Sequence, residues 1–122
     1  MKISVSCAQL LPKLGDRAAN LEKMSAYVEQ IMAEKPGTNL IVFPELMTSG
    51  YEGTPEMFQE LAETLPNGES MQVMGALAKK HHVHIIYGLP ERDPVLTDVL
   101  YNAAVLINSD GVAVGTYRKV HP

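Results

Sequence analysis

Two charged side chains in this sequence directly follow apolar segments, and their chemistry depends on that placement. Glu45 comes after residues 40–43, a continuously apolar run with β-branched members, and after Pro44. Such a run is typical of a strand that is covered on both faces. The Glu45 carboxylate then stands at the carboxyl end of the strand, where open α/β sheets bind their ligands, and it can act as a base there. The alternative is an ordinary solvated carboxylate at the entrance of a loop.

Lys119 occupies a comparable position later in the chain. It follows the segment 112–117 and lies next to Arg118. Taken alone, it is interpreted as a surface cation, because lysine side chains are rarely buried.

The single cysteine, Cys7, alternates with serines and lies in phase with Ile3 and Val5. This period predicts a strand with one buried face. We expect Cys7 on that face, where a thiol behaves as a small inert hydrophobe rather than a nucleophile. A lone cysteine forms no internal disulfide, so a reducing compartment, the cytoplasm, is the default expectation.

Three histidines, His81, His82 and His84, suggest a metal site at first sight. A helix is expected to end near His82 and a strand to begin at Val83, so the three rings need not converge. No cysteine or carboxylate motif completes a ligand set. Histidines at the carboxyl end of a helix are explained by the helix dipole. We therefore expect no metal, and the lack of a Gly-rich phosphate loop implies no nucleotide cofactor.

The elements expected around these residues alternate between strands and helices. Helical spacing predicts a helix that Asp16 caps and that Pro36 and Gly37 end. The remaining predicted elements are strands over residues 3–7, 40–43, 83–89, 99–107 and 112–117, helices over residues 57–65 and 71–78, and a turn at 109–111. This order predicts an α/β fold in which helices pack on a sheet.

Composition and charge limit the classes of function that we expect for this protein. Of the 122 residues, 46% are hydrophobic and 20% are charged, which predicts one globular domain with a core. The net charge of −4 is scattered, so nucleic acid is not an expected partner. No window reaches the roughly 18 uninterrupted apolar residues of a membrane span, so a membrane is not expected either.

Several motifs follow one another in a particular order. They are Ala8-Gln9, Gly15-Asp16, Ala19-Asn20-Leu21, Val42-Phe43-Pro44-Glu45-Leu46, Gly50-Tyr51, Tyr101-Asn102-Ala103-Ala104, Asp110-Gly111 and Tyr117-Arg118-Lys119-Val120-His121. This order resembles the nitrilase superfamily, the carbon–nitrogen hydrolases. The resemblance covers the whole chain and implies that residues 1–122 are the amino-terminal half of the family's domain, truncated after the lysine motif. It also implies an α-β-β-α sandwich, with a mixed sheet and helices on its outer face.

In that family a glutamate, a lysine and a cysteine carry the reaction. The resemblance implies that Glu45 is the general base and that Lys119 steadies the oxyanion. A carboxylate within reach can take the proton of a thiol, and a cation in a dry pocket stabilises a tetrahedral oxyanion. The family's cysteine comes after the lysine motif, so we expect the nucleophile outside these residues and expect Cys7 not to replace it.

The resemblance also implies a place for Tyr51, because the family commonly lines its substrate pocket from this loop. The alternative is an aromatic side chain that pins the loop to the body of the protein.

Two functions remain open. The first is a hydrolase that cleaves a small amide, carbamoyl or nitrile substrate through a cysteine acyl-enzyme, without a cofactor, in which this chain alone is inactive. The second is a catalytically inactive module that self-associates or binds a companion chain. Both hypotheses predict a homo-oligomer or a missing carboxy-terminal portion. The apolar strands 40–43 and 83–89 need a second layer to cover them.

Overall fold

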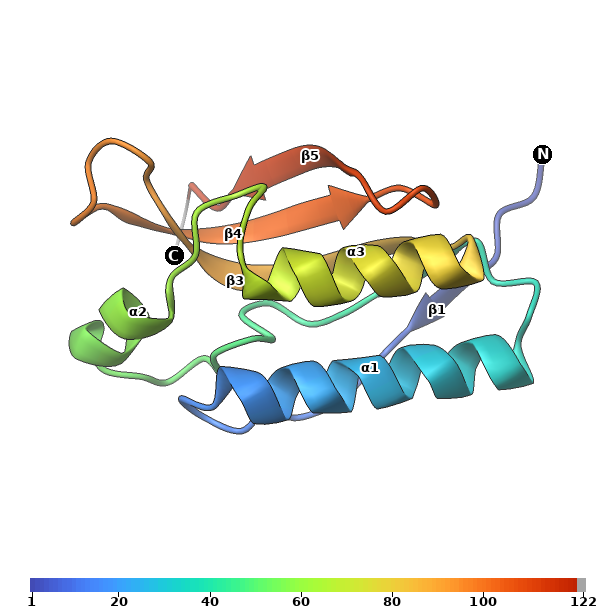
Figure 1. The fold of residues 1–122 in the computed structure, drawn as a ribbon. Helices are drawn as coiled ribbons and strands as arrows, with labels where there is room; N and C mark the ends of the chain where they lie inside the picture. The colour runs from blue at the N-terminus through green and yellow to red at the C-terminus, as the bar shows by residue number, and fades with distance from the viewer. Residues whose placement is uncertain (121–122) are drawn as a thin grey trace.

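One mixed sheet and three helices form the part of the chain that the computed structural model describes, residues 1–120 (Figure 1). In chain order the elements are β1 (Val5–Cys7), α1 (Arg17–Glu34), β2 (Leu40–Val42), α2 (Pro55–Leu61), α3 (Glu69–His81), β3 (His84–Arg92), β4 (Leu100–Ile107) and β5 (Ala113–Arg118). The strands lie in that same order in the sheet. Strands β1 to β3 are parallel, whereas β4 is antiparallel to β3 and to β5. Strand β5 therefore points the same way as β2, and their carboxyl ends meet at one edge.

The two long helices, α1 and α3, lie side by side and cover one face of the sheet (Figure 1). The side chain of Asp16 accepts a hydrogen bond from the Ala19 N–H, which confirms the predicted cap of α1. The core lies between these helices and the sheet and includes Leu21, Met24, Val28, Ile41, Met74, Ala78, Ile85, Tyr87, Val105 and Ile107. This arrangement confirms the predicted α/β fold with a mixed sheet and helices on one face. Within residues 1–120, no helix combines the length and the apolar character needed to cross a membrane.

Within residues 1–120, the opposite face of the sheet carries no helix, and we call it the open face. The strand register places on it Val5, Cys7, Leu40, Val42, Ile86, Ala104, Leu106 and Tyr117. Val5 is 50% exposed, Tyr117 is 66% exposed, and Cys7 is also exposed. The prediction that Cys7 is buried is therefore wrong for this structure. The alternation in β1 was interpreted correctly, but the apolar face it marks is the open one, and Ser6 faces the helices.

Strand β3 and helix α2 end several residues away from their predicted limits, and each of these two differences has a backbone cause. Strand β3 runs past Gly88 and Pro90 to Arg92 because β4 pairs with it along its whole length. Helix α2 ends at Leu61 rather than continuing to 65, because Glu63 forms a parallel bridge with Glu91 of β3. The Glu63 N–H donates to the Pro90 carbonyl at 3.0 Å, and the Arg92 N–H donates to the Glu63 carbonyl at 2.8 Å.

A buried amide ties the start of α1 to the loop that follows Glu45. Asn20 is fully buried, and its Oδ1 accepts the Lys13 N–H at 2.7 Å. Its Nδ2 donates to the Lys13 carbonyl at 2.8 Å and to the Thr48 carbonyl at 3.1 Å. The Gly15 N–H adds a bond of 2.8 Å to the Ser49 carbonyl. Two loops that are distant in sequence are thereby held together.

Replacing Asn20 should loosen this connection. Asn20→Ala leaves the buried Thr48 carbonyl and the partly buried carbonyl and N–H of Lys13 without their partner, and we expect a loss of about 1–3 kcal/mol in the free energy of unfolding. Asn20→Asp should also destabilise, because it replaces the amide donor with an acceptor that faces two carbonyl oxygens. Urea unfolding followed by circular dichroism measures both. Glu22→Ala, at an exposed position of the same helix, is the control; an equal loss in the control would show that the amide network contributes nothing.

Candidate active site

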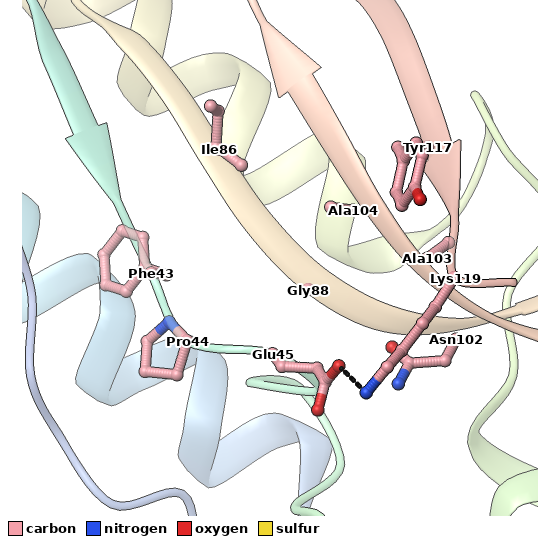
Figure 2. A pocket seen from close by; sticks show the side chains of 10 residues that line it. All are labelled: Phe43, Pro44, Glu45, Ile86, Gly88, Asn102, Ala103, Ala104, Tyr117 and Lys119. Carbon is pink, nitrogen blue, oxygen red and sulfur yellow. Dashed lines mark hydrogen bonds and ion pairs between the residues drawn. The ribbon is translucent and has the colours of Figure 1, made fainter. Parts of the chain in front are cut away.

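Glu45 and Lys119 meet at the edge of the sheet where β2 and β5 end. The Lys119 Nζ donates to Glu45 Oε1 at 3.0 Å, although the two residues are 74 apart in sequence (Figure 2). Glu45 follows β2 by three residues and Lys119 follows β5 directly, so the parallel direction of these strands explains the meeting. Their side chains are 39% and 36% exposed, respectively. The structure thus brings together the two residues that the sequence singled out.

The pair closes one end of a cleft of about 350 Å³. The other lining residues are Phe43, Pro44, Ile86, Gly88, Asn102, Ala103, Ala104 and Tyr117 (Figure 2). Most of these side chains are apolar, so a ligand in the cleft would meet its charged groups only at the Glu45–Lys119 end. This arrangement can take a proton with a carboxylate and stabilise a negative oxygen with an ammonium at one place.

The neighbourhood of Lys119 favours its charged form. The hydrogen bond from Lys119 to the Glu45 carboxylate raises the pKa of the ammonium, the negative charge of Glu45 raises it further, and partial desolvation opposes both. Tyr51 adds a smaller effect that also raises this pKa. Lys119 is therefore a cation throughout the neutral pH range, the state in which an ammonium can stabilise a negative oxygen.

The backbone of Glu45 is held by an unusually close approach to β3. The Gly88 N–H donates to the Pro44 carbonyl at 3.3 Å. A Cβ atom on Gly88 would lie 2.5 Å from the Leu46 nitrogen and 2.8 Å from the Glu45 Cα, so only glycine fits here. Leu46 has a φ of +48°, a left-handed conformation that costs a leucine energy and that turns the chain sharply after Glu45.

Gly88 and Asn102 are site residues that position alone did not reveal. Gly88 lies inside the strand predicted over residues 83–89, and a glycine inside an apolar strand is a signal of close backbone approach. Asn102 belongs to the Tyr-Asn-Ala-Ala motif, lines the cleft, and accepts the Lys119 N–H on its carbonyl at 2.9 Å. That bond extends the β4–β5 ladder to the backbone of Lys119.

The other candidates do not line the cleft. Tyr51 is 58% exposed and lies outside the cleft walls, so its substrate-binding role stays a prediction. Cys7 lies on β1, where it pairs with Val42, and is not among the lining residues. His81 Nε2 is 2.8 Å from Glu29 Oε1, a contact between α1 and α3 that lowers the pKa of Glu29.

Within residues 1–120, no three or more histidine, cysteine, aspartate or glutamate side chains are grouped so as to hold a metal ion. His121, from the lysine motif, lies outside the described residues.

The close packing of the Glu45 backbone against Gly88 can be tested without an activity assay. Gly88→Ala should push the Glu45 backbone away from β3, lowering the free energy of unfolding by about 1–3 kcal/mol. It should also lower the pKa of Lys119 toward the ordinary lysine value, because the Glu45 carboxylate moves out of reach. Urea unfolding and an NMR titration of the Lys119 side chain measure the two effects.

Gly115→Ala is the matched control, because no atom lies within 4 Å of the Cβ it would add to β5. If Gly88→Ala behaves like Gly115→Ala in both measurements, the close approach does not position Glu45.

Comparisons with known proteins show which family the sequence matches. The carbon-nitrogen hydrolase family model matches residues 4–122. The "Probable nitrilase C965.09" of Schizosaccharomyces pombe is 46% identical over 121 residues, which cover 99% of this chain and 44% of that protein. The omega-amidase NIT3 of Saccharomyces cerevisiae is 36% identical over 124 residues, covering 98% of this chain and 42% of that protein.

The fold agrees with the same group of proteins. The crystal structure of Saccharomyces cerevisiae Nit3, a member of branch 10 of the nitrilase superfamily, superposes with a TM-score of 0.86 at 34% identity. The match covers 98% of this chain and 44% of that one, so the chain spans less than half the length of these relatives. The chain belongs to the carbon–nitrogen hydrolases, the nitrilase superfamily, and corresponds to an amino-terminal portion of its members.

Proposed function

We propose that this chain is the amino-terminal part of an enzyme that hydrolyses a non-peptide amide, carbamoyl or nitrile bond through a cysteine acyl-enzyme. The observation that carries the proposal is the 3.0 Å contact between Lys119 and Glu45 at the end of an apolar cleft, in a chain of this family. The nucleophilic thiol comes from residues that follow these 122. No cofactor is needed, because thiol, carboxylate and ammonium supply every step.

For an amide, the reaction begins when Glu45 takes the proton of the thiol. The thiolate attacks the carbonyl carbon, and the electron pair of the C=O bond moves to oxygen. The Lys119 ammonium stabilises that oxyanion. When the intermediate collapses, the C–N bond breaks and protonated Glu45 gives its proton to the leaving amine or ammonia. Water, deprotonated by Glu45, then attacks the thioester, which releases the carboxylic acid and restores the thiol.

The contact between Glu45 and Lys119 is compatible with the way charge moves during this reaction. Before the reaction, the ammonium of Lys119 faces the carboxylate of Glu45. As Glu45 takes up a proton and loses its charge, a negative charge develops on the substrate oxygen. Lys119 then exchanges one anionic partner for another, and the net charge of the site stays the same. A cation already in place needs little reorganisation, which is the source of its catalytic value.

Turnover in the polypeptide encoded by the complete reading frame tests the proposal. We expect ammonia release from an ω-amide, a carbamoyl amine or a nitrile. Glu45→Gln should lower kcat/KM by about 10²–10⁴-fold and Lys119→Ala by about 10²–10³-fold, with the fold retained.

Cys7→Ser, a change outside the cleft, is the control and should leave turnover unchanged. Unchanged turnover in the Glu45 or Lys119 variant would remove that residue from the mechanism. A reading frame that adds no cysteine beyond residue 122 would contradict the enzyme proposal.

The open face supports a second candidate, an inactive module that self-associates or binds a companion chain. Its apolar side chains, with Val5 50% and Tyr117 66% exposed, form a surface that water solvates poorly. We expect the 122-residue chain to sediment as a dimer or larger species, and Val42→Lys on this face to shift it toward monomer. Glu56→Lys, on exposed α2, is the control. A stable monomer before any substitution would contradict self-association.

A further inference from the structure

A second ion pair lies on the other side of the sheet, next to the site. Arg118 Nε donates to Glu91 Oε1 and one of its terminal amino groups donates to Glu91 Oε2, both at 2.9 Å. The Glu91 side chain is only 5% exposed. Two parallel hydrogen bonds between planar groups fix the orientation of the guanidinium as well as its distance.

An aromatic ring holds the same guanidinium from a third direction. The Arg118 Cζ lies 3.9 Å from the centre of the Tyr101 ring, a cation–π contact. The Tyr101 hydroxyl donates to Asp93 Oδ2 at 2.6 Å, and together with the Val95 and Leu96 N–H groups it lowers the pKa of Asp93 to about 2. The ring is therefore itself held in place. We call Glu91, Tyr101 and Arg118 the arginine clamp.

The clamp adjoins the backbone of Lys119. Side chains alternate along a strand, so Arg118 points to the helix side while Tyr117 and Lys119 face the cleft. The Lys119 N–H bonds to the Asn102 carbonyl, directly beside the contact between Arg118 and Tyr101. In the described sheet β5 is an edge strand that pairs only with β4. The ends of such strands open easily unless something beyond the ladder holds them.

We propose that Arg118, held by Glu91 and Tyr101, is a positioning residue that keeps the Lys119 ammonium within reach of Glu45. The clamp crosses β4 and anchors the end of β5 to β3, the strand that also supports Glu45 through Gly88. Both Glu45 and Lys119 are thereby held in place by the same strand, β3. The catalytic role of the Lys119 ammonium rests on the proposed function. Its placement next to Glu45 does not.

The test measures the pKa of Lys119 by NMR titration in the 122-residue chain. Glu45→Gln removes the partner of Lys119 and gives the reference for an unpaired ammonium, which should titrate at a lower pH than in the unsubstituted chain. The double variant Glu91→Gln with Arg118→Met removes the clamp without leaving a buried charge unpaired or changing the net charge. We expect its Lys119 pKa to fall to the Glu45→Gln reference.

The single variant Arg118→Met separates positioning from simple electrostatics. The loss of a neighbouring positive charge would by itself raise the pKa of Lys119. Loss of position instead lowers it, because the Glu45 carboxylate is no longer in contact. A fall in this variant supports the proposal, and a rise overturns it.

The matched control is the double variant Glu69→Gln with Arg17→Met, which removes another arginine–glutamate pair, 3.3 Å long, at the amino ends of α1 and α3. It should leave the Lys119 pKa unchanged. Should the clamp variants not fold, Arg118→Lys keeps the charge but lacks the fork of two donors, and its Lys119 pKa should still fall.

An unchanged Lys119 pKa in a folded clamp variant, or in Glu45→Gln itself, would overturn the proposal. None of these titrations involves turnover. Loss of the hydrolase function would therefore leave the positioning role standing, and the reverse also holds.

Discussion

Strand β3 is the constraint on which the Glu45–Lys119 contact depends. Gly88 allows the chain around Glu45 to lie directly on this strand, and Glu91, three residues further on, binds Arg118 beside Lys119. β3 is paired with β2 on one side and β4 on the other, so it has little freedom to move. Two residues 74 apart in sequence are thus placed by a four-residue stretch of one strand.

The ion pair itself is a weak source of stability. Both side chains are more than a third exposed, and exposed pairs contribute little because water and salt screen them. The geometry must therefore be maintained by the backbone and by groups around the pair. The fully buried Asn20, the left-handed Leu46 and the Arg118–Glu91 pair all serve this purpose. A site held in this way keeps two charges close whether or not their attraction is strong.

Most elements were predicted from the sequence because their signals are local: apolar runs gave the strands, and helical spacing gave the helices. Glu45 and Lys119 were singled out together by the ordered motifs of the family resemblance, since Lys119 taken alone is interpreted as a surface cation, and the structure places the two side chains in contact. The supports of the site were missed, since each depends on a partner far away in the chain. Gly88 matters because of Leu46, and Glu91 because of Arg118. For Cys7, alternation identified an apolar face but could not tell what covers it.

The separation of Glu45 and Lys119 also orders events during synthesis. A ribosome adds about 5–20 residues per second, so the 74-residue interval takes several seconds, whereas helices form within about a microsecond. The nascent chain therefore carries the Glu45 carboxylate for a long time before its cation emerges. The charge of Glu45 is balanced only when β5 docks and brings Lys119 to it, so the ion pair forms late in the synthesis of these residues.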